Sequence, residues 1–288
     1  MSEDFEEMKA GSPLFTYSNR YRRNIGIIGA LVGMVSGVLE DRRQIWVAIK
    51  RNLKSAYSNT MLGMGWSVIM PLVPISAYAV LGLLFGRTNS AMPYLLYVSI
   101  GFTVFSLISW PIAGTLTSLR SEAGLLARSD IRMTTVILSA YGQQIWDNGI
   151  RIIVVLLGMA YFQSPIHIAS LLSIMIIIPA VLFSMGIGGI AALLYVVAKD
   201  VGNIVTVGMR YLVFFSAVIF PMPQIPLVQK WIVVNPIYTY VNEARSLIVF
   251  GEFQKPEVLA WTIGASVLLF IVVNTIFYRL EARIRTYF

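Results

Sequence analysis

The chain has 288 residues, of which 57% are hydrophobic and only 12% are charged, and this composition excludes a soluble globular protein, which could not bury so much apolar surface. The net charge of +8 does not indicate nucleic-acid binding, because the basic residues stand at the ends of apolar runs rather than in one patch. We therefore expect a polytopic membrane protein, with membrane lipids and no nucleic acid as partners.

Residues 1–65 are predicted to form a cytoplasmic segment ahead of the membrane domain. The acidic start has no apolar core beside a cleavage site, so we expect no cleaved signal peptide. Residues 25–39 form an apolar run of marginal length, which we place on or partly in the inner leaflet. Three glycines of this run share one helix face and permit close contact with another helix, including one of a second copy: Gly29, Gly33 and Gly37.

Between Glu40 and Tyr57 the sequence predicts an amphipathic helix. Its apolar face carries Ile45, Ile49, Leu53 and Ala56, and the opposite face carries Arg43, Lys50, Arg51 and Lys54. This arrangement is typical of a helix that lies in the inner membrane interface. Such a helix would be either a plain anchor or a lever that a cytoplasmic partner pushes.

Six later apolar runs are long enough to cross a bilayer, which requires roughly 20 residues. They lie at about 67–86, 93–118, 134–162, 169–197, 203–220 and 257–278. We therefore predict that residues 66–288 form an all-α transmembrane domain of six spans.

Residues 221–255 are apolar but do not fit a further span. Pro221, Pro223 and Pro226 end the fifth run, and the pair Asn235-Pro236 breaks the segment that follows. Non-helical backbone at membrane depth persists only inside protein or beside a water-filled cavity. We therefore predict a re-entrant helical hairpin on the outer side, between spans five and six, which suits a lid over a conduit.

The distribution of basic residues orients the chain. Most lysines and arginines fall in segments that this topology places inside, whereas the outer segments hold only Arg87, Lys230, Arg245 and Lys255. Both termini are therefore predicted to be cytoplasmic.

Two arginines fall within predicted spans, where a lone charge is costly and usually faces the protein interior. Arg151 shares one helix stripe with Gln144, Asp147 and Asn148, which favours a polar seam inside the protein. Arg210 has no acidic neighbour in the sequence, so it either faces a conduit or finds a buried partner such as Asp147.

Motifs for catalysis are missing. The sequence has no Gly-x-x-x-x-Gly-Lys-Ser/Thr phosphate loop, no His-Glu-x-x-His helix and no cysteine, so we expect neither an enzyme nor a metal or cofactor site in this chain. Asp147 is the only acidic residue well inside a predicted span, which argues against a proton-driven carrier. What remains is a conduit without a motor, so a separate chain would have to bind ATP and Mg.

Several short motifs follow one another in a specific order. The basic helix precedes Leu62-Gly63-Met64-Gly65-Trp66 and Pro71-Leu72, the first inner connection holds Leu125-Leu126-Ala127-Arg128, and the fifth run is followed by Pro221, Ile225-Pro226, Asn235-Pro236, Glu243-Ala244-Arg245 and Gly251. In this order and spacing the chain, from about residue 40 onward, resembles the ABC-2 type polysaccharide-export permeases of ATP-binding-cassette transporters. It departs from many of them at Lys199-Asp200, where they have Arg-Asp, and in its longer segment before Glu40.

The resemblance implies a homodimer that joins two copies of a cytoplasmic ATPase in the bacterial cytoplasmic membrane. It implies export of a lipid-linked glycan, such as an O-antigen, a capsular polysaccharide or a teichoic-acid-like polymer. By the same resemblance, the conduit would form between protomers, largely from the first and fifth spans.

We assign candidate residues to three parts of this hypothesis. Aromatic faces accept sugar C–H groups and a cation can meet a phosphate, so the candidate conduit residues are Tyr78, Phe85, Arg210, Phe214 and Phe220. Coupling to the ATPase is assigned to Arg51, Arg120, Glu122, Arg128, Asp130 and Arg132. The outer gate is assigned to Pro221, Pro226, Asn235, Pro236 and Arg245.

Two other classes of function remain open from the sequence. One is a permease of the same architecture for a small lipophile or drug, which would require a lateral apolar pocket and fewer polar residues along the fifth span. The other is a membrane scaffold without a conduit, with which no ATPase would copurify.

Overall fold

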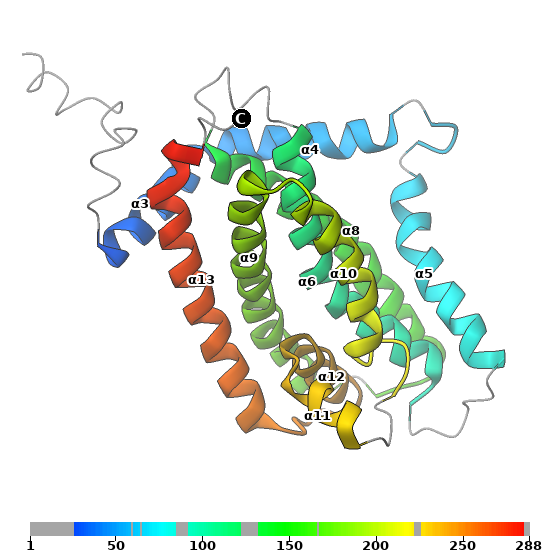
Figure 1. Ribbon diagram of the computed structural model, residues 1–288. Helices are drawn as coiled ribbons and strands as arrows, with labels where there is room; N and C mark the ends of the chain where they lie inside the picture. The colour runs from blue at the N-terminus through cyan, green and yellow to red at the C-terminus, as the bar shows by residue number, and fades with distance from the viewer. Residues whose placement is uncertain are drawn as a thin grey trace, which may run out of the picture.

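The computed structural model describes residues 26–58, 60–63, 65–84, 92–121, 132–165, 167–221 and 226–284. Within these ranges every regular element is a helix and none is a strand, which confirms the all-α prediction (Figure 1). In chain order the elements are α3 (Ile27–Glu40), α4 (Arg42–Tyr57), α5 (Gly65–Leu84), α6 (Tyr94–Ser121), α8 (Met133–Tyr161), the 3₁₀-helix η2 (Ile168–Ser173), α9 (Ile174–Val197), α10 (Val201–Phe215), α11 (Pro226–Val234), α12 (Pro236–Phe250) and α13 (Pro256–Ile284).

The helices begin close to the starts of the predicted apolar runs, and η2 with α9 forms the fourth run. The predicted hairpin is also helical, with its break at Asn235 between α11 and α12. In Figure 1, α11 and α12 lie at the end of the molecule opposite α4, and they do not run along the long helices.

Three stretches within the described residues are long and apolar enough to cross a membrane: Tyr94–Leu119, Ile168–Tyr195 and Pro256–Leu280. Three shorter apolar helices lie at Ile27–Glu40, Gly65–Tyr78 and Val201–Phe215. The chain therefore has the helices of a multi-pass membrane protein, while the total of six spans and the re-entrant course of the hairpin stay predictions.

The fifth element ends earlier than predicted, at Phe215 rather than at Phe220. Residues 216–220 form a turn in which Ala217 has a left-handed φ of 49°. In a helix that continued to Pro221, the proline ring would clash with the carbonyl of Ala217. With 15 residues, α10 is shorter than the roughly 20 that a perpendicular span requires.

The helix α6 is the centre of the bundle. In the most apolar 18-residue stretch of α6, 83% is buried, against 24% in η2–α9 and 33% in α13. The helix α6 packs against α5, α8, α9, α10 and α12. The largest apolar cluster joins Phe102, Ile108 and Ile112 of α6 to Ile75 of α5 and Val213 of α10. Both α5 and α10 are therefore positioned by the same central helix.

Polar side chains join α6, α8 and α9 inside the bundle. Ser106 of α6 donates a hydrogen bond of 2.6 Å to Asn148 of α8, and the hydroxyls of Tyr141 and Ser184 lie 3.3 Å apart between α8 and α9. Arg151 is fully buried, with its guanidinium 4.0 Å from the centre of the Trp110 ring. These contacts confirm a polar seam inside the protein, where such bonds help to hold membrane helices together.

The helices α3 and α4 lie at the end of the bundle opposite α12 (Figure 1). A Cβ added at Gly33 would collide with the hydroxyl of Tyr278 on α13, and one added at Gly37 would lie 2.8 Å from Arg132. The close contact that the glycine spacing predicted is therefore made within this chain.

The helix α4 is amphipathic, as predicted, and packs against α8. Ile45 and Ile49 are half-buried, whereas Arg43, Lys50 and Arg51 are exposed. Ile49 occupies the space beside Gly142, so that a Cβ at that glycine would collide with it. The contact between α4 and the bundle thus depends on a glycine of α8.

Replacing Gly142 by valine should displace Ile49 and loosen α4 from α8. Overpacking of this kind typically costs about 1–3 kcal/mol. The matched control is Gly149→Val in the same helix, because a Cβ at Gly149 meets no atom within 4 Å. Thermal unfolding of the purified protein in detergent should show a lower midpoint for Gly142→Val than for Gly149→Val. Equal midpoints would contradict this account of the α4 contact.

Candidate transport pathway and the anchor of α10

One face of α10 is exposed along its whole length. Its buried side packs Val205, Met209, Leu212 and Val213 into the main apolar cluster with α6. The other side exposes Asn203, Ile204, Thr206, Val207, Arg210, Tyr211, Phe214 and Phe215. These residues recur at intervals of three and four, so they form one stripe, which we call the α10 stripe.

The α10 stripe combines polar and aromatic groups. Asn203, Thr206 and Arg210 supply hydrogen-bonding groups, and Phe214 supplies an aromatic face that is 47% exposed. Arg210 is exposed in this chain, so it is not the buried partner of Asp147. A stripe with this mixture suits a surface that contacts a polar ligand or a second protein rather than lipid tails.

A second exposed surface lies on α5, which packs against α6 and α8. The side chains of Val68, Ile69, Met70, Val73 and Val80 are each more than a third exposed. Tyr78 is half-buried, and its ring lies 6.3 Å from that of Phe102 on α6. Among the predicted conduit residues, Arg210, Phe214 and Phe220 are therefore exposed, Tyr78 is partly packed, and Phe85 lies outside the described residues.

The turn after α10 has backbone carbonyls that no helix satisfies, and side chains bind them instead. The Tyr97 hydroxyl donates to the carbonyls of Ala217 (2.8 Å) and Phe220 (3.4 Å). The Tyr94 hydroxyl donates to the carbonyl of Ile219 (2.9 Å). Without such donors, each of these carbonyls would be a costly unpaired group in an apolar environment.

Arg245 of α12 is the centre of this arrangement. Its side chain is buried, and its Nη1 and Nη2 donate to the carbonyls of Ala217 (2.9 Å) and Val218 (2.8 Å). Its Nε donates to the carbonyl of Tyr97 (3.0 Å), and its guanidinium lies 3.6 Å from the centre of the Tyr97 ring. One planar guanidinium therefore joins α12, α6 and the turn after α10.

The approach of Arg245 to α6 requires a glycine. A Cβ at Gly101 would collide with Nη2 of Arg245 and would lie 2.9 Å from its Cζ. Gly101 follows Tyr97 by one helical turn, so its missing side chain leaves a gap beside the carbonyl that Arg245 binds. Any larger residue would displace the guanidinium.

The break between α11 and α12 is held by Asn235. Its side-chain oxygen accepts a hydrogen bond from the Ile237 amide (3.0 Å), which caps α12, and Pro236 occupies the first turn of the helix, where its missing N–H has no cost. Its Nδ2 donates to the carbonyl of Phe215 (3.2 Å) and to the Ser216 hydroxyl (2.9 Å). Asn235 therefore caps one helix and also binds the end of another.

Glu243 attaches α12 to the start of α13. The carboxylate is buried, and it accepts hydrogen bonds from the amides of Gln254 (2.9 Å) and Lys255 (3.2 Å), which directly precede α13. Tyr240, one turn earlier, shares a 2.7 Å hydrogen bond with Ser266 of α13. The short helix α12 is thus bound on one side to α6 and α10 and on the other to α13.

These contacts give the predicted outer-gate residues different surroundings. Pro221 is exposed and Pro226 begins α11, whereas Asn235 and Arg245 form the anchor of α10. A gate that yields during transport stays a prediction. The contacts of Arg245 are those of a fixed support.

The predicted coupling residues fall largely outside the described part of the chain. Residues 122–131, which include Glu122, Arg128 and Asp130, are not described, and neither is the side chain of Arg120. Arg51 is exposed on α4. Arg132 is buried rather than free for docking, because it forms hydrogen bonds of 2.5 Å with the carbonyl of Gly37 and with the carboxylate of Glu40.

Sequence reasoning missed three residues of the anchor, which are Tyr94, Tyr97 and Gly101, and it named Glu243 only as part of a motif, without a role. The two tyrosines stand three residues apart at the start of an apolar helix, and a buried glycine follows at position 101. That pattern could have indicated a polar gap beside α6. The side chain that fills the gap is Arg245, which lies 148 residues after Tyr97, and no local pattern identifies it.

These features define a helical, multi-pass membrane protein that presents one mixed polar and aromatic helix face on a rigid support. Comparison with known proteins assigns it more closely. The ABC-2 type transporter family matches residues 43–249, so the chain belongs to that family. Members of this family are membrane subunits of ABC transporters, which implies a partner ATPase and no catalytic role for the chain itself.

A curated relative carries a more specific description. The O-antigen export system permease protein RfbA of Myxococcus xanthus is 20% identical over 255 residues, which cover 86% of this chain and 96% of that protein. The similarity extends over nearly the whole of both chains, although the identity is low.

Replacing Arg245 by lysine should destabilise the protein by about 1–3 kcal/mol, because the compact ammonium cannot span acceptors that lie on different sides of the guanidinium, and the Val218 carbonyl would lose the bond from Nη2. The matched control is Arg210→Lys, an exposed cation whose replacement should change stability by less than about 0.5 kcal/mol. Thermal unfolding in detergent measures both variants. If Arg245→Lys unfolds at the same temperature as Arg210→Lys, the anchor does not support the fold.

Proposed function

We propose that this chain is the membrane subunit of an ABC transporter that exports a lipid-linked polysaccharide across the bacterial cytoplasmic membrane. Two copies of the chain would form the permease, and two copies of a separate ATPase would bind ATP and Mg and drive it. The proposal is supported by the similarity, over 86% of this chain, to an O-antigen export permease. It is supported independently by the mixed character of the α10 stripe.

The α10 stripe is the main structural support for the proposal. A glycan presents hydroxyls and C–H faces, which match amide, hydroxyl and aromatic groups respectively. Asn203 and Thr206 offer the first kind of contact and Phe214 offers the second. Arg210 lies between them and would meet the phosphate of a lipid carrier or an acidic sugar.

A homodimer would give the exposed faces of α5 and α10 a common use. Both helices pack on α6, and both leave large side chains exposed, Met70 and Val73 on α5 and Tyr211 and Phe215 on α10. In a dimer, these faces would line a path between the two copies.

The contacts of Arg132 suggest how a partner would act on the chain. Arg132 binds Gly37 and Glu40, at the end of α3, and lies 3.4 Å from the carboxylate of Asp41. Thr135 also donates to Asp41 (2.7 Å), which precedes α4. The start of α8 is therefore tied to the corner between α3 and α4, and a push from a cytoplasmic partner on either element would reach the other.

Transport of a small lipophile would require a lateral apolar pocket and a less polar fifth helix. A lateral pocket exists, but it is lined by α6, α8, η2–α9 and α12 together with His167, and no residue of α10 contributes to it. The exposed side of α10 keeps Asn203, Thr206 and Arg210. These two observations favour the glycan over the lipophile.

A tagged copy of the chain should copurify with an ABC ATPase in equal amounts, and cells without the chain should lose the glycan from their surface. Lipid-linked glycan should then accumulate on the cytoplasmic side, which labelling in sealed and opened membrane vesicles can measure. Absence of any ATPase would support a scaffold instead. A copurifying ATPase with normal surface glycan would leave the family assignment intact but reject the substrate.

Replacing Arg210 by glutamine should lower glycan export about tenfold if its charge contributes about 1.4 kcal/mol to binding of an anionic group. The matched control is Lys199→Gln, an exposed cation that precedes α10 and lies outside the stripe. Export and the stimulation of ATPase activity by substrate should both fall for Arg210→Gln only. Normal export by Arg210→Gln at a normal protein level would remove this residue from the pathway.

A further inference from the structure

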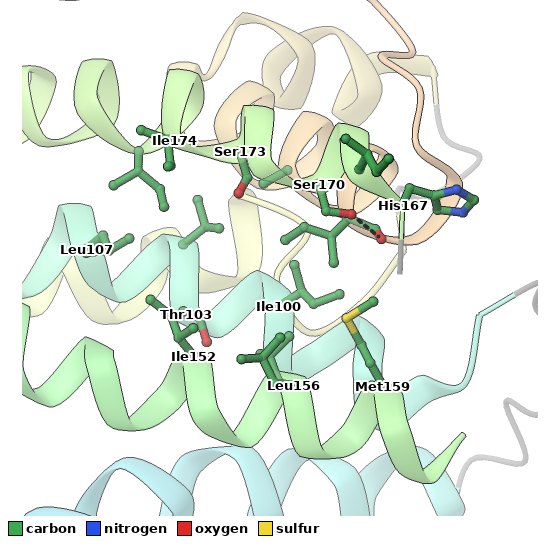
Figure 2. A pocket seen from close by; sticks show the side chains of 16 residues that line it. Ile100, Thr103, Leu107, Ile152, Leu156, Met159, His167, Ser170, Ser173 and Ile174 are labelled. Carbon is green, nitrogen blue, oxygen red and sulfur yellow. Dashed lines mark hydrogen bonds between the residues drawn. The ribbon is translucent and has the colours of Figure 1, made fainter. Parts of the chain in front are cut away.

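A cavity of about 520 Å³ opens on the side of the bundle, and none of the described side chains of α5 and α10 lines it. Its lining comes from α6, α8, η2–α9 and α12, together with His167, which precedes η2 (Figure 2). The lining residues include Ile100 and Leu107 of α6, and Ile152, Leu156 and Met159 of α8. They also include Ser170, Ser173 and Ile174 of η2–α9, and Ala244 and Ile248 of α12. Its size lies within the range of about 300–1,000 Å³ that is typical of ligand sites.

The cavity has the shape of a slot that runs along the helices. Its lining extends from Ile100 to Leu107 on α6 and from Met159 back to Ile152 on α8. At a rise of 1.5 Å per residue, each of these stretches is about 10 Å long. A slot parallel to membrane helices has the direction in which lipid tails lie in a bilayer.

The lining offers little to a polar ligand. Among the residues that the structure describes, no lysine, arginine, aspartate or glutamate contributes to it. The Thr103 hydroxyl donates to the carbonyl of Ser99 (2.7 Å), and the Ser170 hydroxyl donates to the carbonyl of Ile248 (3.2 Å). Because these hydroxyls are used within the protein, the slot presents mainly aliphatic surface.

The mouth of the slot continues into the lipid-facing surface. Ile152 and Leu156 on α8 are 40% and 50% exposed, and Ile174 on α9 is 56% exposed. In a membrane protein, such side chains contact the hydrocarbon of the bilayer. An acyl chain can therefore enter from the side without crossing any polar surface.

One end of the slot is less apolar than the other. His167 is half-buried and packs against Gly251 at the end of α12. In Figure 2, His167 and Ser170 lie at one end, and Ile174 and Leu107 lie at the other. An amphiphile would therefore place its headgroup near His167 and its tail toward Leu107.

We propose that this slot binds one acyl chain of a bilayer phospholipid, in the leaflet on the side of α11 and α12. The lipid would pack against Ala244 and Ile248, on either side of Arg245 in α12, and would thereby support the helix that anchors α10. The transported substrate is a less suitable occupant, because none of the described side chains of α5 and α10 lines the slot. The proposal requires a membrane location but not glycan export.

A substitution can fill the slot without changing Arg245 or the groups that bind it. Leu156→Trp places a large ring at a lining position, whereas Leu157→Trp makes the same change at the next residue, which is 65% exposed and does not line the slot. Each variant is purified in detergent without added lipid, and the phospholipid that remains bound per chain is measured by extraction and mass spectrometry. We expect Leu156→Trp to retain about tenfold less phospholipid than the wild type or Leu157→Trp, which corresponds to about 1.4 kcal/mol.

A second pair, Ile152→Trp and Ile153→Trp, repeats the comparison if Leu156→Trp does not fold. A phospholipid with a photoreactive group in its acyl chain should also label lining residues of α6, α8 and α9 in the wild type.

Equal phospholipid retention by both members of each pair would overturn the proposal, because the lipid would then bind to the general surface of the protein. Recovery of detergent or of a lipid-linked glycan in place of phospholipid would overturn it as well. Neither result would bear on export, which is measured separately.

Discussion

The structure depends on how the backbone carbonyls after α10 are satisfied. A helix that ends inside an apolar environment leaves carbonyls with no partner, and each unpaired group is costly. Here Arg245, Tyr94, Tyr97 and Asn235 donate to the carbonyls of residues 215 and 217–220. Because these bonds are made, α10 can stop at Phe215 and the chain can turn without reaching water.

The short helix α12 supports both sides of the bundle. Arg245 binds it to α6 and to the turn after α10, and Glu243 and Tyr240 bind it to α13. The opposite end of α10 is less enclosed, since residues 197–200 and Asn203 are exposed. The two ends of α10 therefore differ, because one is bound to α12 and α6 and the other is exposed.

Several parts of the fold and site follow from local patterns. Apolar runs predicted the positions of the long helices, and Asn235-Pro236 predicted the break between α11 and α12, because proline cannot continue a helix and asparagine caps one. Amphipathic spacing predicted α4. The end of α10 was wrong by five residues, since nothing near Phe215 in the sequence shows that donors from α6 and α12 will bind the following carbonyls. Arg132 was assigned to a docking surface, but its contacts with α3 are known only from the fold.

The sequence by itself determined the class of protein, the helices and the breaks between them, because hydrophobicity, proline and glycine act over a few residues. Only the tertiary structure decided what each charge does. Arg245 and Arg210 are both arginines in apolar surroundings, yet one is buried among carbonyls and the other is exposed. The difference arises from Gly101 and Tyr97, which lie more than 140 residues before Arg245 and provide space and acceptors for one guanidinium. Such a match between distant segments exists only after the chain has folded.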